Sequence, residues 1–264
     1  MSKYFHIFKM SVAKQLAYRL NLLLGRFQSL IILLLLYFLW TEVSRSTGQF
    51  AGLTSTELVS YILLVHLLRP VVFGSLSAGV ADEINQGIFS TYLIKPMSHF
   101  WFCYWRELGE RTVLFGAATI EVLIIAFLIK PTMPLTVAGW GLVLFFISLL
   151  IAHFLYVLLS YCIHLLAFWS REATGLRFLY YWLVEFSSGA YFPLHIVAPA
   201  ALLLLKILPF NLMLYTPVML FLGKVPADTL LSIILSQFGW LAVAVILTAV
   251  IWKRGLRRYS GEGI

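Results

Sequence analysis

The stretch SSGAYFPLHIVAPAALLLLKILPFNLMLYTPVMLFLG, from Ser187 to Gly223, contains one basic residue, Lys206, and no acid. A membrane-spanning helix needs about 20 apolar residues, so the stretch is too long for one span. Two spans would need a polar turn, and the middle offers only Lys206 and Asn211. Prolines interrupt it at Pro193, Pro199, Pro209 and Pro217.

This pattern predicts a re-entrant hairpin over residues 193–223. One short helix, from Ile196 to Leu208, enters the membrane, and a second, from Asn211 to Leu222, returns, with Pro209 and Phe210 at the turn. Irregular backbone at membrane depth is tolerated only where protein buries it or where it lines a cavity. We therefore expect the hairpin to cover an external opening.

The composition identifies an all-α membrane protein. The chain is 61% hydrophobic and 11% charged, with a mean hydropathy of +0.94, whereas soluble domains carry about 25% charged residues. The net charge of +8 does not indicate a nucleic-acid partner, because the basic residues flank the apolar runs. Residues 1–264 are expected to form a single transmembrane domain. The six predicted spans are Leu22–Val43, Leu58–Gly79, Thr112–Ile129, Val137–Trp169, Glu172–Phe192 and Leu230–Trp252.

The distribution of Lys and Arg predicts that both termini are cytoplasmic. With that orientation most of the 19 basic residues fall on the cytoplasmic side, as the positive-inside rule requires. The hairpin then lies outside. Residues 1–21 form an amphipathic helix at the cytoplasmic interface, with Phe5, Phe8, Val12, Leu16 and Leu20 near one face. It is either a plain anchor or a lever that contacts a cytoplasmic partner.

Residues 80–111 form the most informative cytoplasmic segment. Asp82 and Glu83 suit the first turn of a short helix, because the helix dipole favours acids there. Lys95 and Pro96 break the chain, and HFWFCYW then supplies an aromatic belt. The segment is either a docking element for a cytoplasmic protein or a solvated loop.

No motif for enzyme chemistry is present in the sequence. It has no P-loop, no HExxH or clustered Cys and His, and no GxSxG elbow. The two cysteines, Cys103 and Cys162, lack metal-type spacing. We expect no catalytic, cofactor or metal site on this chain. A haem held by His66 and His153 is an alternative, because axial ligands need matched depth on two helices and both histidines lie near mid-membrane.

Charged residues inside the spans predict an intramembrane polar layer. Arg69, Glu121 and Glu185 fall at a similar depth, near His66 and His153. A lone charge there costs about 2.5–3.5 kcal/mol, so pairing is expected. Because consecutive spans are usually neighbours, the sequence predicts an Arg69–Glu121 pair, with Glu185 facing the interior or a translocation path. The layer is either structural or functional.

Two motifs resemble those of the permease subunit of an ABC type-2 exporter, of the bacterial branch with adjacent paired permease genes. EINQGIFSTYLIKPMSHFWFCYWRELGER is similar to the family's loop after the second span, and the stretch quoted first is similar to the segment before the last span. The resemblance implies an inner-membrane exporter whose two permeases, identical or homologous, stand in lipid above two copies of a separate ATPase. That ATPase would bind ATP and magnesium.

The resemblance also assigns roles to residues. The N-terminal helix would be a connecting helix. The path would follow the second and fifth spans, near Glu185. The coupling helix would contain Asp82, Glu83, Asn85, Gln86 and Gly87, and the path or external gate would contain Phe186, Tyr191, Phe192, Pro193, Pro209 and Phe210.

Two other classes of protein stay open on the sequence alone. One is a secondary transporter or channel that uses Glu121 and Glu185 as ion or proton sites, and the other is an intramembrane enzyme or cytochrome. For the exporter, Glu83→Arg is expected to uncouple transport from ATP hydrolysis while leaving the fold intact. Transport unchanged by charge reversal at both Asp82 and Glu83 would reject the docking assignment. The apolar lining suggests an amphipathic or lipid-linked substrate.

Overall fold

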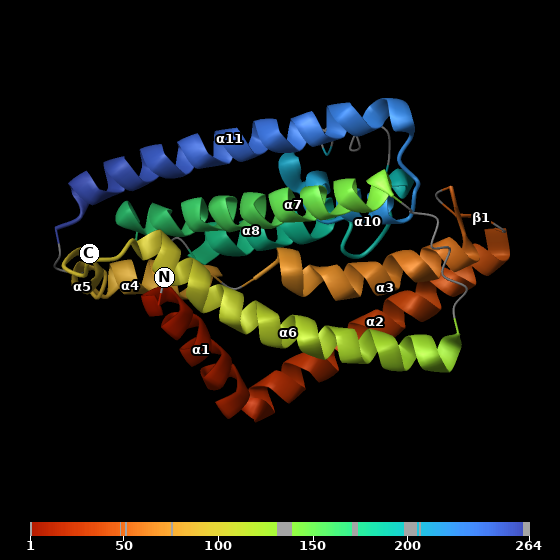
Figure 1. Ribbon diagram of the computed structural model, residues 1–264, viewed down its shortest axis with the longest axis horizontal. Coiled ribbons are helices and arrows are strands. Elements are labelled where there is room, and N and C mark those ends of the chain that lie inside the picture. Colours follow the sequence, from red (N-terminus) through yellow and green to blue (C-terminus); the bar gives the residue numbers. More distant parts are fainter. Residues whose placement is uncertain are drawn as a thin grey trace.

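The computed structural model describes residues 2–47, 49–50, 52–74, 76–130, 139–170, 174–197, 205 and 207–260. These residues form a helical bundle with one two-stranded hairpin (Figure 1). The elements are α1 (Ser2–Ala17), α2 (Arg19–Thr47), β1 (Gln49–Phe50), β2 (Leu53–Thr54), α3 (Ser55–Val72), α4 (Leu76–Asn85), α5 (Ser90–Leu93), α6 (His99–Ile129), α7 (Trp140–Leu165), η1 (Leu166–Phe168), α8 (Thr174–Ser187), η2 (Leu194–Ile196), η3 (Pro209–Leu212), α10 (Tyr215–Phe221) and α11 (Ala227–Arg258).

Five helices among the described residues are long and apolar enough to cross a membrane. They are Arg19–Arg45, Ser55–Val72, His99–Ile129, Trp140–Phe168 and Ala227–Arg258. The fifth predicted span corresponds to α8, which has only 14 residues. The all-α membrane fold predicted from the composition is therefore confirmed.

Helices α3 and α7 form the inside of the bundle. In the 18-residue apolar stretch of each helix, 67% of the residues are buried in α3, against 6% in α2 and 11% in α11. Helix α7 packs against α11 on one side and α10 on another, while α3 packs against α2 and α6. Both chain ends lie at the same end of the bundle as α4 and α5, which we call the terminal end (Figure 1).

The second predicted span is not continuous. Helix α3 ends at Val72, Phe73 is extended, and α4 begins only at Leu76, so the expected span to Gly79 is wrong. Pro70 lies in the last turn of α3 and cannot donate a backbone hydrogen bond. At the break, the Tyr156 hydroxyl donates to the Gly74 carbonyl at 2.9 Å.

The third predicted span is longer than expected. Helix α6 begins at His99 rather than Thr112, so the aromatic belt forms its first turns and is not a loop. Helix α1 packs against this part of α6. Ser11 donates to the Arg106 carbonyl, and the rings of Phe8 and Trp105 meet edge to face at 6.5 Å.

The predicted re-entrant hairpin is only partly within the described residues. Most of its first helix, from Ile196 to Leu208, lies outside them. Its second half comprises η3, which packs against α8 and α11, and α10, which packs against α7 and α3. The turn before it is fixed at Gly189, whose φ is +83° and whose carbonyl accepts a 2.6 Å hydrogen bond from the Tyr61 hydroxyl.

The break after α3 gives a prediction about Gly74. A Cβ at this position would collide with the buried side chains of Glu107 and Arg111. We expect Gly74→Ala to lower the stability by about 1–3 kcal/mol, as overpacking does. Thermal unfolding of the purified protein in detergent measures the change.

Gly116→Ala is the matched control. This residue lies within α6, and a Cβ there meets nothing within 4 Å. Alanine is the better helix former by about 1 kcal/mol, so stability should stay level or rise. Equal losses in both variants would show that the close approach at Gly74 does not constrain the break.

Candidate functional site

Among the described residues, three arginine–carboxylate pairs join or brace the long helices within the bundle. Arg26 of α2 pairs with Glu121 of α6, Arg69 of α3 with Glu185 of α8, and Arg111 with Glu107 one turn earlier on α6. Burial of an unpaired charge is costly, so each cation neutralises one acid. We call these six side chains, with His66 and His153, the polar network.

Glu121 is bonded by two partners. The Nε of Arg26 donates to one carboxylate oxygen at 2.8 Å, and the Nε2 of His66 lies 2.7 Å from the other. The predicted Arg69–Glu121 pair is therefore wrong. The prediction considered only charges near mid-membrane, and Arg26 lies about one turn from the predicted start of the first span at Leu22.

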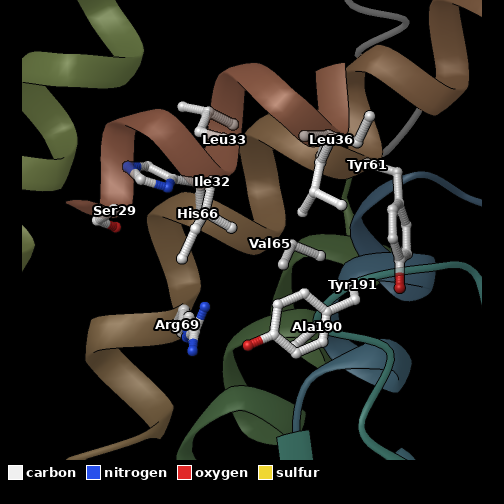
Figure 2. Close-up of a pocket in the computed structure, with 11 residues that line it drawn as sticks. Ser29, Ile32, Leu33, Leu36, Tyr61, Val65, His66, Arg69, Ala190 and Tyr191 are labelled. Carbon is white, nitrogen blue, oxygen red and sulfur yellow. The ribbon is translucent and has the colours of Figure 1, made fainter. Parts of the chain in front are cut away.

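Glu185 is the partner of Arg69. The Nη2 of Arg69 donates to Oε1 of Glu185 at 2.6 Å, and the carboxylate is almost fully buried. The second oxygen, Oε2, has no hydrogen-bond partner among the described residues. The guanidinium also lies over the Tyr191 ring, 5.7 Å from its centroid. Figure 2 shows Arg69 and Tyr191 at one side of a small cavity between α2 and α3, with His66 nearby.

Arg111 closes the broken end of α3. Its Nη1 donates to the carbonyls of Val71 and Val72 at 2.9 and 2.8 Å, which are among the carbonyls that a helix end leaves unsatisfied. The Nδ1 of His153 lies 2.7 Å from the Val71 carbonyl. Glu107 neutralises Arg111 through a 2.7 Å bond to its Nε.

The network borders a cavity of about 310 Å³. It is lined by side chains of all three pairs, together with Glu110, Tyr156 and Tyr181. Cavities of a few hundred Å³ with a few converging polar groups are typical of ligand sites. The cavity therefore brings Arg69, Glu185 and His66 to one place, while the nearby Glu121 and His153 lie behind its lining.

The residues predicted for a path or gate lie between α8 and α10. Phe186 is half exposed on α8 and stacks on Trp182. Tyr191 is held through its carbonyl, which accepts a 2.9 Å bond from the indole of Trp40. The other members, Phe192, Pro193, Pro209 and Phe210, are half-buried or buried.

The segment between α4 and α6 is anchored by Phe89. This side chain is fully buried and contacts the rings of His99, Phe168 and Tyr259 edge to face. The Tyr259 hydroxyl donates to the Gly87 carbonyl at 3.0 Å and accepts from the Ser90 amide. The C-terminal end of the chain thus holds the segment in place.

The two acids of this segment have different environments. Asp82 is 57% exposed and lies 3.8 Å from Arg177. Glu83 is 12% exposed and bonds Arg106 at 2.8 Å and His99 at 3.1 Å. Burial raises the pKa of the Glu83 carboxyl, but these hydrogen bonds outweigh it, so its pKa lies below the ordinary value. Burial and the neighbouring Glu83 raise the pKa of Tyr92 to about 12.

The exposed part of the segment includes three aliphatic side chains among polar ones such as Thr91 and Lys95. Ile94 is 86% exposed, and Ile88 and Leu93 are also exposed. Gln86 is exposed beside them, whereas Asn85 and Gly87 are half-buried. We call Gln86, Ile88, Leu93 and Ile94 the aliphatic tip. Apolar side chains grouped at the polar end of a membrane bundle mark an interaction surface.

Arg26, Glu107 and Arg111 belong to the polar network but not to the polar layer predicted from the sequence. The spacing of Glu107 and Arg111, four residues apart, is a visible helix signal, but both were placed in the flank of a span that actually begins at His99. Arg26 carried no signal of its own, because its partner lies 95 residues away.

The Arg69–Glu185 pair gives a second prediction. Glu185→Gln leaves the Arg69 charge without its partner, and breaking a buried pair costs about 3–5 kcal/mol. Because Arg69 is 26% exposed, we expect the lower end of that range. Reversing both residues, with Arg69→Glu and Glu185→Arg, should recover part of the loss in thermal unfolding. A double variant that is no more stable than Arg69→Glu or Glu185→Arg alone would contradict the pairing.

Asp82 and Glu83 give a third prediction. It revises the expectation from the sequence that charge reversal at Glu83 leaves the fold intact. Glu83→Arg places two cations together beside His99, so we expect a clear loss of thermal stability. Asp82→Arg breaks only an exposed pair, worth at most about 1 kcal/mol, and should fold normally. Normal stability of the Glu83 variant would show that its contacts do not support the segment.

Comparison with known proteins identifies the chain's family. A family model described as ABC-2 family transporter protein matches residues 30–263. No match was found among curated proteins or solved structures. The matched range contains the broken α3, the aliphatic tip and all of the polar network except Arg26. The chain therefore belongs to the ABC-2 family of transporter proteins.

Proposed function

We propose that this chain, a membrane transport subunit of an ABC transporter, is the permease of an ATP-driven exporter that works with a separate ATPase. Family membership supports the permease role, and the sequence has no P-loop for ATP. ATP and magnesium would bind the partner ATPase, below the inner membrane. Two copies of this chain, or this chain and a homologue, would enclose the path.

The aliphatic tip is the observation that carries the proposal. Its residues are exposed, yet Phe89 and Tyr259 hold the backbone beneath them rigidly. A fixed apolar surface loses little conformational entropy when it binds. Asp82, on the same segment, and Gln86 within the tip would supply polar contacts. Glu83 supports the surface from inside rather than contacting the ATPase.

The placement of the termini agrees with this assignment. Both chain ends lie at the end of the bundle that carries the aliphatic tip (Figure 1), and the positive-inside rule puts them in the cytoplasm. Helix α1 packs on α6 directly beside this segment. A push on the tip would therefore reach α1 and α6 together, as a connecting helix requires.

The substrate path is proposed along α3 and α8. Helix α8 exposes Phe178, Tyr181 and Phe186, which gives a second subunit an aromatic face. On the inner side, the Arg69–Glu185 pair joins α8 to α3. The residues from Tyr191 to Pro193, with Pro209 and Phe210, would close the outer end. An amphipathic substrate suits apolar walls around a polar layer.

A secondary transporter is the competing function. It would need carboxylates that are free to bind an ion or proton. Glu121 is already bonded by Arg26 and His66, whereas Oε2 of Glu185 has no hydrogen-bond partner within the described part of the chain. Only Glu185 therefore favours this reading, which predicts transport without ATP.

The proposal predicts that the aliphatic tip binds the ATPase. Ile94→Asp places a charge at a contact that should be apolar, and such central residues are worth about 2 kcal/mol or more. We expect at least about tenfold weaker binding to the co-expressed ABC ATPase, with loss of ATP-driven transport in proteoliposomes.

Ala227→Asp is the control for added charge. This residue is exposed at the start of α11, at the opposite end of the bundle. It should leave ATPase binding unchanged. Normal ATPase binding by the Ile94 variant would reject the docking surface, and transport that continues without ATP would favour the secondary transporter.

A further inference from the structure

A sulfur, a nitrogen and a carboxylate oxygen converge at the terminal end of the bundle. His99 and Cys103 lie one turn apart on α6, and Glu83 reaches them from α4. The Sγ of Cys103 is 3.6 Å from the Nε2 of His99, which is 3.1 Å from Oε2 of Glu83. The three atoms lie within 4.8 Å of one another.

We propose that Glu83, His99 and Cys103 form a binding site for a zinc-class divalent metal ion. Zinc bonds of about 2.0–2.3 Å in a tetrahedron place the ligand atoms roughly 3.3–3.6 Å apart. The observed separations need only small side-chain shifts to meet this. A thiolate, an imidazole and a carboxylate are all ligands that zinc accepts.

The surroundings of the three ligands resemble those of metal sites. In such sites the second ring nitrogen of a histidine and the second oxygen of a carboxylate are held by outer partners. Here the Nδ1 of His99 lies 2.9 Å from the Tyr161 hydroxyl. Oε1 of Glu83 accepts from Arg106 at 2.8 Å. Both ligands therefore keep one atom within 4.8 Å of the Cys103 sulfur.

Packing holds the ligands in place. Cys103 is fully buried, and His99 is 3% exposed. The imidazole stacks on Trp252 at 5.9 Å and meets Phe89 edge to face at 4.8 Å. Rigid ligands lose little entropy when an ion binds, which favours affinity.

A groove of about 480 Å³ leads to the site. His99 is part of its lining, together with Tyr161, Trp252 and Lys95. Glu83 and Cys103 do not line the groove, so an ion would enter past the His99 ring, and water would be its fourth ligand, as in open zinc sites. A dication with one thiolate and one carboxylate is neutral, so Arg106 beside it is not repelled.

A metal here would join α4 to α6 beneath the aliphatic tip. If the tip docks an ATPase, the ion would stiffen the docking surface, and this consequence rests on the proposed function. The metal site itself does not, because it can be measured on the chain alone. The two proposals can therefore fail separately.

Cobalt titration of the purified full-length chain in detergent tests the site. Cobalt bonded to a thiolate gives a strong near-ultraviolet absorption band that carboxylate and imidazole ligands do not give. The chain has two cysteines, so in Cys162→Ser any such band comes from Cys103. We expect this variant to bind one cobalt with the band, and zinc to displace it.

Two further variants test the assignment. Cys103→Ser should abolish the band. Tyr161→Phe removes the outer partner of His99 and should weaken cobalt binding by about 10–100-fold, the usual effect of such partners. The same Cys162→Ser protein, treated with a maleimide during unfolding, should show Cys103 protected by zinc, which covers the case that Cys103→Ser does not fold.

Two results would overturn the proposal. One is the absence of a thiolate band and of zinc protection in Cys162→Ser, which would make the cluster a hydrogen-bond network alone. The other is a band that persists in Cys103→Ser, which would place the metal at Cys162.

Discussion

The capping of α3 by Arg111 is the interaction on which the rest of the structure depends. An unsatisfied backbone carbonyl in lipid costs several kcal/mol, and α3 ends at Val72 inside the bundle. The Arg111 guanidinium bonds the last carbonyls, and Glu107 neutralises its charge. Gly74 leaves room for both. The chain can then turn into α4 without exposing polar backbone to lipid.

That break determines where the aliphatic tip lies. If α3 continued straight, residues 76–85 would extend the span. Instead α4 packs against α7, and Phe89 enters the aromatic cluster of α6, η1 and the C-terminal end. The tip is therefore presented by a rigid base. The same base contains Glu83, His99 and Cys103, so the proposed docking surface and the proposed metal site share one support.

Ion pairs between helices fix how the inner helices are positioned relative to one another. Arg26 joins α2 to α6, and Arg69 joins α3 to α8. In low dielectric such pairs tolerate little displacement. Under the proposed function, movement of α8 relative to α3 would disturb the Arg69–Glu185 pair first, at the wall of the polar cavity. The pair would therefore break or re-form when the proposed path changes its conformation.

The sequence by itself determined the membrane class, most of the helices and the need for a buried polar layer, because apolar length and charge cost are local properties. Only the tertiary structure decided that Arg69 pairs with Glu185, that Glu83 turns inward, and that α3 breaks at Gly74. The physical reason is that each depends on groups distant in the chain. Arg26 and Glu121 are 95 residues apart, and no periodicity within one helix reports which face of another will meet it.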